Sequence, residues 1–578
     1  MTSVVPEDRL SDESDSAART AISPKPVGPA PVGPALVSPA PVVPEPGAAR
    51  AAGSPEPVAD GATAAPVSRT HREIIRAMSG LMLGMFVTLL SSTVVSTSLP
   101  VIVADLGGGQ SAFTWVVTAT LLATTVSTPI WGKLADLTSR TLLVQLALGI
   151  FVLGSALAGL STSPGMLISF RVMQGLGAGG MTALVVIVMA DLISPRERGR
   201  YMGLLGGVTG VAMVAGPLLG GVVTDAFGWR WNFFIGVPIA VVAAVVLQRT
   251  LHLPVRRSKV RIDYLGAGLI AAGVSALLIW VTLAGGSFDW MSWQSAVFVV
   301  GSIVVLVAAV FVERSAASPV IPMHLFGMRT AVLSIIASAV VGIALFGSTV
   351  FLGEFLQLSR GKTPTEAGLL TIPMVVGLFL SSLVIGRIIS ATGRYKRWMV
   401  IGAVLSLVGF ALLATMTSHS PLLLMGIYLF VLGAGTGMVM QNLVLIVQNE
   451  IAASEMGAAS AAVAFFRTLG GAIGVSALGA VLGSRVGSLT AEGIASKNVP
   501  PAQLSVLSDG LPEPAVVRGL PDPIRSVLQD AFAGGVAEVF MITAGLSIIT
   551  VITMLLLRER PLGTRNAVEL LAESKSTS

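Results

Sequence analysis

Side chains that carry out chemistry are few in this 578-residue chain, which has 30 Asp and Glu, 36 Lys and Arg, four His and no Cys. The absence of Cys excludes disulfides, thiolate metal sites and thiol nucleophiles. The sequence has no Gly-rich phosphate-binding motif of the P-loop type. The histidines lie far apart, without metal-ligand spacing, at His71, His252, His324 and His419. We therefore expect no enzyme, no cofactor and no metal.

The remaining candidates are charged residues inside long apolar stretches, namely Arg171, Glu354 and Arg467. A charge at mid-bilayer costs at least ~2.5 kcal/mol unless it is satisfied, so such residues point to function. Arg467 either binds an anionic group and favours the charged form of a nearby acid, or makes a structural contact. Glu354 is the best candidate for a titrating acid, although a solvated position near the outer rim explains it equally well.

These charges lie among fourteen apolar stretches of about 18–25 residues, each long enough to cross ~30 Å of hydrocarbon as a helix. Only 11% of the residues are charged, far fewer than in a water-soluble protein. Backbone groups in lipid have no partners outside their own helix. We therefore predict an all-α membrane protein with 14 transmembrane helices and the lipid bilayer as a partner.

Basic residues set the predicted orientation. Residues 1–70 are rich in Pro and Ala and predict a disordered cytoplasmic tail, and they show no cleaved signal peptide. Bases gather in every second loop, among them Arg196, Arg198, Arg200, Arg256, Arg257, Lys259, Arg261, Arg394, Lys396 and Arg397. The positive-inside rule then places both termini in the cytoplasm. We expect the membrane to be the plasma (cell inner) membrane. The net charge of +6 is a topology signal and indicates no nucleic-acid partner.

An internal repeat divides the chain. Residues 132–140 (GKLADLTSR) and 386–394 (GRIISATGR) share a Gly-to-Arg spacing, and 197–199 (ERG) has a counterpart in 455–457 (EMG) at nearly the same offset. Repeated halves with a central site are typical of transporters. We predict six-helix halves at 76–250 and 329–560. Two inserted helices lie in 251–328, a long outer loop spans 485–535, and a cytoplasmic tail spans 561–578.

Two segments predict contacts between or within these halves. Gly132, Asp136 and Arg140 form either an ion-paired latch between helix ends or an ordinary solvated turn. In the fifth span, Gly203, Gly206, Gly207 and Gly210 share one face, and Pro217 should bend the helix. This face is either a tight seam between the halves or simple close packing.

Five motifs together resemble the major facilitator superfamily, specifically its 14-helix drug:proton antiporter branch. They are residues 132–140, 171–177 (RVMQGLG), 210–221 (GVAMVAGPLLGG), 229–238 (WRWNFFIGVP) and 466–471 (FRTLGG). The resemblance spans roughly residues 76–560. It implies two six-helix halves that rock between alternating-access states.

The resemblance also implies roles for single residues. Asp191 would join Gly132, Asp136 and Arg140 in the latch. Ser139 and Thr141 stand where the family usually has Gly and a base, so we expect a weaker latch here. Arg171 would take part in proton coupling, unless it bonds only to loop or helix-end carbonyls. The antiporter seam of the fifth helix would comprise Gly210, Gly216, Pro217, Gly220 and Gly221. Ser91 stands where the family usually has an Asp, so the expected proton-carrying acid is missing.

Polar and aromatic residues in the spans suggest a substrate cavity that suits amphiphilic compounds. The candidates are Ser91, Ser92, Ser96, Gln174, Gln441, Asn442, Phe465 and Phe466, although packing on lipid or a neighbouring helix explains any single aromatic ring better. In the outer loop, apolar positions within 522–540 recur at helical spacing and predict an interfacial helix before the last span.

These features predict a proton-coupled secondary exporter of small amphiphilic compounds, with drugs or antibiotics as the cargo implied by the resemblance. The alternative within this class is a dedicated exporter of one natural product, lipid or siderophore. A membrane-embedded enzyme is disfavoured because no catalytic constellation is found. Two complete halves in one chain allow a functional monomer.

Overall fold

The computed structural model describes residues 71–565 except 109, 252, 254–262, 286, 498–516 and 518. The predicted tail 1–70 and the bases at 256–261 lie outside these residues. In the first repeat the helices are α1 (His71–Asp105), α2 (Gln110–Leu137), α3 (Arg140–Gly159), α4 (Pro164–Leu192), α5 (Pro195–Phe227), the short α6 (Trp231–Phe234) and α7 (Gly236–Thr250).

Two inserted helices follow, α8 (Tyr264–Leu283) and α9 (Trp293–Ser315), and then a 3-10 turn, η1 (Met323–Gly327). The second repeat contains α10 (Arg329–Glu354), the π-helical turn η2 (Phe355–Ser359), α11 (Pro364–Leu370), α12 (Ile372–Thr392), α13 (Lys396–Leu413), α14 (Leu422–Met440), α15 (Asn442–Glu450), α16 (Met456–Lys497) and α19 (Ile524–Leu556). Each of the fourteen predicted spans corresponds to one long helix or helix pair.

Length and apolar composition explain these helices. Thirteen helices in the described part of the chain are long and apolar enough to cross a membrane. The predicted second span is also helical, as the 28-residue α2, although it is not among these thirteen. Several helices begin with a side-chain cap: Ser139 accepts a hydrogen bond from the Leu142 N–H, and Thr363 forms a reciprocal capping box with Glu366.

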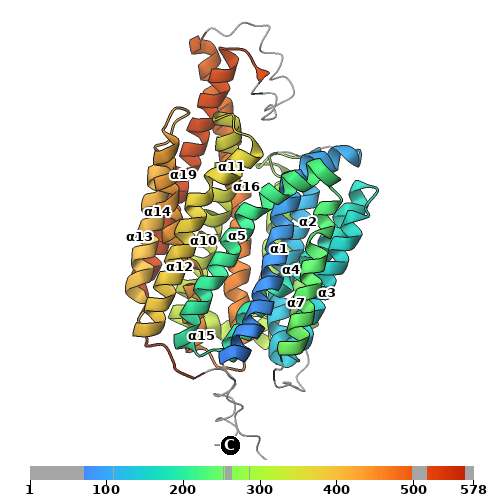
Figure 1. The fold of residues 1–578 in the computed structure, drawn as a ribbon, viewed down its shortest axis with the longest axis vertical. Coiled ribbons are helices and arrows are strands. Elements are labelled where there is room, and N and C mark those ends of the chain that lie inside the picture. The colour runs from blue at the N-terminus through green and yellow to red at the C-terminus, as the bar shows by residue number, and fades with distance from the viewer. Residues whose placement is uncertain are drawn as a thin grey trace, which may run out of the picture. The chain divides into compact units, whose positions relative to one another are not determined.

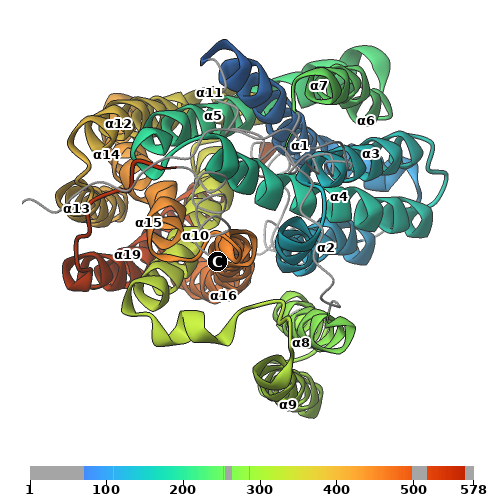
Figure 2. The same cartoon turned by 90° about the horizontal axis from the view of Figure 1, so that it is seen from below.

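The helices of each repeat pack together, and the repeats meet along two helix pairs. α5 of the first repeat lies along α12 of the second, and α2 lies along α16. The inserted helices α8 and α9 pack on each other at the side of the bundle, where α8 contacts α2 and α16 (Figure 2). The fold is thus all-helical over the described residues, as predicted, with the inserted pair lateral to the two repeats.

The motif 229–238 ties helix ends together on one side of the first repeat. The Trp229 ring N–H and the Arg230 guanidinium both donate to the carboxylate of Asp105 at the end of α1, at 2.9 and 3.1 Å. The buried Asn232 amide donates to Ser98 on α1 and Thr224 on α5, at 2.6 and 2.7 Å. These polar contacts fix the ends of α1, α5 and α7 relative to one another.

The predicted loop 485–535 is helical at both of its described ends, and the separate interfacial helix predicted before the last span is wrong. Residues up to 497 continue α16, and residues from 524 onward already belong to α19, so the two helices extend side by side beyond the bundle (Figure 1). The apolar positions assigned to a membrane surface bury one another instead, since Val486, Leu489 and Ile494 pack with Ile524, Val527 and Leu528. The helical period was correct, but the partner of the apolar face is the neighbouring helix.

This packing predicts that Leu528→Ala destabilises the helix extension. Leu528 is fully buried, and truncating a buried Leu costs about 2–5 kcal/mol. Hydrogen exchange of residues 486–497 should therefore accelerate at least tenfold, while residues 456–475 in the bundle exchange as before. Gln529→Ala, one position along α19, is the control. Unchanged exchange in 486–497 would mean that the extension is not held by this apolar contact.

Candidate functional site

Two close crossings of the repeats lie at the end of the bundle where α2 turns into α3, which we call the 137–140 end. A Cβ atom on Gly132 of α2 would lie only 2.9 Å from the carbonyl oxygen of Gly457 on α16. On the other helix pair, a Cβ on Gly199 of α5 would lie 2.6 Å from the carbonyl oxygen of Gly386 on α12. Real side chains cannot sit this close, so both crossings require glycine.

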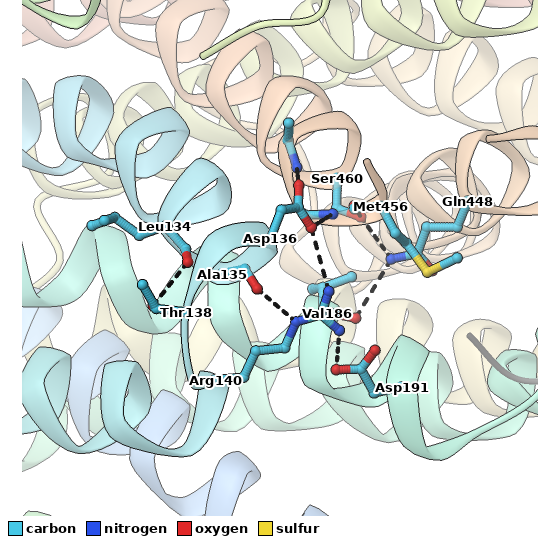
Figure 3. Close-up of polar contacts among 12 residues, drawn as sticks. Leu134, Ala135, Asp136, Thr138, Arg140, Val186, Asp191, Gln448, Met456 and Ser460 are labelled. Carbon is cyan, nitrogen blue, oxygen red and sulfur yellow. Dashed lines mark hydrogen bonds and ion pairs between the residues drawn. The ribbon is translucent and has the colours of Figure 1, made fainter. Parts of the chain in front are cut away.

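The carboxylate of Asp136 closes the first crossing (Figure 3). Its two oxygens accept hydrogen bonds from the backbone N–H groups of Gly457 and Ala458, both at 2.9 Å. Those N–H groups belong to the first turn of α16, where no helical acceptor exists and the helix dipole attracts negative charge. Because Asp136 belongs to the first repeat and α16 to the second, this charged contact joins the two repeats.

Arg140 holds the carboxylate in place from the start of α3 (Figure 3). Its Nη2 lies 3.3 Å from Asp136, its Nε donates to the Ala135 carbonyl at 3.0 Å, and its Nη1 pairs with Asp191 at the end of α4. Both carboxylates and the guanidinium are buried. The four residues predicted for the latch, including Gly132, are therefore brought together, and their role in transport stays a prediction.

The second crossing repeats this arrangement with a neutral side chain. Ser390 follows Gly386 by four residues, as Asp136 follows Gly132. The Ser390 hydroxyl accepts a hydrogen bond from the Arg200 N–H at 3.2 Å. Only the α2–α16 crossing thus has a carboxylate on a helix N-terminus, which makes the closure of the 137–140 end electrostatically asymmetric.

Arg198 and Gln448 form a further link that the sequence analysis missed. Arg198, expected in a basic loop, is fully buried in the first turn of α5 and donates to the Ile193 and Ala190 carbonyls and to the Gln448 side chain, at 2.8 to 3.0 Å. The Gln448 amide donates in turn to Ser460 on α16 at 2.8 Å. The repeated element at 197–199 and 455–457 was the available signal, because it placed this arginine beside the repeat contact.

The predicted seam on α5 divides between two neighbours. Gly203, Gly206, Gly207 and Gly210 face α12, which confirms that they share one face between the repeats. Gly216 and Gly220 instead face α1 within the first repeat, against Thr93 and Val94. Pro217 and Gly221 lie near Gly368 and Thr365 around α11. The α5–α12 seam therefore comprises these four glycines together with Gly199, and Gly216, Pro217, Gly220 and Gly221 have other packing partners.

Arg171 lies in a buried polar chain within the first repeat. Its Nη1 donates to the Gln174 side-chain oxygen at 2.6 Å, and its Nε approaches the Val116 carbonyl at 3.5 Å. The Gln174 amide donates to the Ser91 hydroxyl at 3.0 Å. Ser91 and Gln174, predicted to contact substrate, are thus buried and bonded to each other, and the position expected to hold an Asp supplies a hydroxyl to the same chain.

The other two candidates for proton coupling lie far apart. Gly342 of α10 is packed against the Arg467 backbone of α16, so these two residues lie at one level of the bundle. Glu354 follows Gly342 by twelve residues on the same helix, or about 18 Å at 1.5 Å per residue. Within the described residues, Arg467 Nη1 is buried without a hydrogen-bond partner, and half-buried Glu354 has no polar partner either.

The remaining predicted cavity residues differ in exposure. Ser92 and Ser96 are exposed. They share one face of α1, which lies between the face that contacts α4 and the face that contacts α5. Gln441 and Asn442 are buried at the junction of α14 and α15, where the Asn442 amide donates to the Met438 carbonyl at 2.7 Å. Phe465 is buried, and Phe466 packs edge-on against Phe326 of η1. Only Ser92, Ser96 and part of Phe466 are therefore open to a ligand in this conformation.

Two helical repeats that meet at reciprocal glycine crossings, with inserted helices at the side, are the architecture of a membrane transporter. Comparison with known proteins specifies the family. The model of the Major Facilitator Superfamily matches residues 81–266 and 261–475. The chain therefore belongs to the Major Facilitator Superfamily and is a multi-pass membrane transporter, not an enzyme.

Two relatives and one solved structure illustrate this similarity. The chain is 37% identical to the uncharacterized MFS-type transporter Rv1877 of Mycobacterium tuberculosis, over 86% of this chain and 71% of that protein. It is 34% identical to the multidrug transporter protein MdtP of Bacillus subtilis, over 71% and 76%. The solved proton:xylose symporter XylE shares the fold alone, with a TM-score of 0.56 and 13% identity, covering 86% of this chain and 99% of that one.

The site predicts that Asp136→Asn loosens the 137–140 end. Hydrogen bonds to a charged group contribute about 1.5–3 kcal/mol, so the ratio of closed to open molecules should fall at least tenfold. A single cysteine at Ser460, buried near the crossing, should then react at least tenfold faster with a polar maleimide. Asp225→Asn, an exposed acid at the other end of α5, is the control. Equal labelling in both variants would show that Asp136 does not stabilise closure.

Proposed function

We propose that this protein is a proton-coupled exporter of small amphiphilic compounds that works by alternating access. The observation that carries the proposal is the charged contact of Asp136 with the N-terminus of α16, because it closes one end of the interface between the repeats. Efflux is also suggested by the similarity to a protein named as a multidrug transporter.

The packing of α16 supports a rocking motion. Its first turns are tightly packed on α2, whereas Gly479, Gly483 and Gly487 in its distal half border open space. One helix is therefore closed on α2 in its first half, while its distal half has one open face of small residues, distinct from the face that packs on α19. Closing the distal half requires releasing the Asp136 contact, since α2 and α16 are rigid helices. We take the 137–140 end as cytoplasmic, on the distribution of bases, in the plasma membrane of the cell.

Coupling to protons requires an acid that changes its protonation during the cycle. The hydroxyl of Ser91 cannot do so, and its network with Gln174 and Arg171 contains no acid. Glu354 is half-buried without a polar partner in the described part of the chain, as suits a carboxyl group that gains and loses a proton. We propose Glu354 as the coupling acid, with Arg171 as an organiser of α1, α2 and α4.

Substrate binding requires an apolar cavity with few polar groups. The exposed hydroxyls of Ser92 and Ser96 offer weak polar contacts on the first repeat. Arg467 offers a guanidinium nitrogen without a partner at the level of Gly342 on the second. We propose that these groups contact the polar end of an amphiphile, with the protein acting as a monomer.

Transport in liposomes with an imposed pH gradient tests the coupling. The purified protein should accumulate a fluorescent amphiphile against its gradient, and a protonophore should abolish the accumulation. Glu354→Gln should leave a slow exchange that no longer responds to the pH gradient, because the amide cannot release a proton. A Glu354→Gln protein that still follows the gradient would exclude this acid.

Arginine variants in the same liposomes test the site. Arg171→Ala and Arg467→Ala should each reduce transport at least tenfold, because each removes a group that the proposal places in the site. Both variants should still insert, since each loses a charge that the membrane interior does not solvate. Arg485→Gln, which breaks only a half-exposed ion pair with Glu538, should keep near-normal transport. Full activity of both alanine variants would refute the site.

A broad panel of compounds tests the substrate range of the wild type. Proton-coupled transport of only one compound in the panel would indicate a dedicated exporter.

A further inference from the structure

Two carboxyl groups face each other where the inserted helices meet the bundle. Asp263 is the N-cap of α8, and Glu313 lies in the last turn of α9. Both residues lie near the 137–140 end, because Lys133, four residues before the end of α2, is near enough to interact with Glu313. Neither carboxyl group belongs to the contacts that close the repeats.

Each of these carboxyl groups has one satisfied and one unsatisfied oxygen. Asp263 Oδ1 accepts the Gly266 N–H at 2.8 Å, and Glu313 Oε2 accepts the Ile321 N–H at 3.1 Å. Asp263 Oδ2 and Glu313 Oε1 are both buried without a hydrogen-bond partner. Only 2% of the Glu313 surface is exposed, so water cannot solvate its free oxygen from outside.

The two unsatisfied oxygens lie beside the same glycine. A Cβ atom on Gly266 would collide with both Asp263 Oδ2 and Glu313 Oε1, so the two oxygens converge over this one glycine. Two ionised carboxylates in this position would repel each other, and each would have a buried oxygen without a donor. A single proton between them removes one charge and turns the two acceptors into a donor and an acceptor.

The charged surroundings do not supply another solution. Lys133 of α2, itself mostly buried, is near enough to interact with both Glu313 and Asp136, but it donates no hydrogen bond to either unsatisfied oxygen. The neighbouring Arg314 is exposed, and His324 of η1 pairs with Glu455. The bases at 256–261 lie outside the described residues. No group of three or more metal-binding side chains occurs in the described ranges, which disfavours a metal ion here.

We propose that Asp263 and Glu313 form a proton-binding site, sharing one proton that joins the inserted helices α8 and α9 where they meet α2. Lys133 connects this site to the closure of the repeats, because it is near enough to interact with both Glu313 and Asp136. With the proton bound, the pair carries one negative charge. Once the proton leaves, a second negative charge competes with Asp136 for the ammonium group. The site therefore links the pH at this end of the bundle to the strength of the α2–α16 contact.

Infrared spectroscopy of the purified full-length protein at neutral pH tests the shared proton. The wild type should show the carbonyl band of a protonated carboxylic acid. Glu313→Gln and Asp263→Asn should each remove the same part of this band, and the double variant should remove no more, because only one proton is present. Asp289→Asn, an exposed acid in the turn between α8 and α9, should leave the band unchanged. A band of wild-type size in either pair variant would overturn the proposal.

Thermal unfolding as a function of pH provides a second readout that needs no transport. The folded pair holds a proton that the unfolded chain releases, so stability should fall as pH rises, by up to tenfold in the unfolding constant per pH unit. Glu313→Gln should lose this dependence and stay folded, since its amide donates to Asp263 as the shared proton does. The proposal fails if the variant keeps the wild-type pH dependence, or if sodium or potassium restores the wild type at high pH, which would indicate a cation site. Neither readout depends on export, so a failure of this proposal would leave the proposed function untouched, and a failure of the proposed function would leave this proposal untouched.

Discussion

The close approach of backbone to backbone at two helix crossings is the constraint on which the rest of the structure depends. Gly132 against Gly457 and Gly199 against Gly386 bring the repeats within contact distance at one end. Only there can the short carboxylate of Asp136 reach the N–H groups of α16. Any side chain at these glycines would separate the helices and remove the hydrogen bonds together with the packing.

The membrane interior explains where the polar groups lie. Lipid offers them no partners, so most buried charges are satisfied by neighbours within the protein. Arg140, Arg171 and Arg198 all follow this rule through carboxylates, amides or carbonyls. Charged groups that break the rule in the described part of the chain include Arg467 Nη1, Glu354 and the facing oxygens of Asp263 and Glu313. These groups are the best candidates for function, because burying a charged group without a partner lowers the stability of the fold.

Sequence reasoning predicted what depends on period and repetition. The apolar stretches, the repeated loops and the shared face of Gly203 to Gly210 all follow from spacing along one helix. It failed where the outcome depends on which face meets which neighbour. The apolar face at 524–528 packs on α16 and not on lipid headgroups. Gly216 faces α1, and Ser91 bonds Gln174, because helix rotation within the bundle cannot be derived from a single sequence. The convergence of Asp263 and Glu313 escaped it for the same reason, since fifty residues separate them.

Distances across both ends of the repeat interface test the central claim most directly. The chain has no cysteine, so spin labels can be placed at Thr138 and Glu455 on the 137–140 end, and at Thr162 and Thr417 on the opposite end. Pulsed electron paramagnetic resonance would then be recorded in liposomes with and without a transported compound at two pH values. The account predicts that the first distance lengthens as the second shortens. Two distances that stay constant, or that change in the same direction, would contradict it.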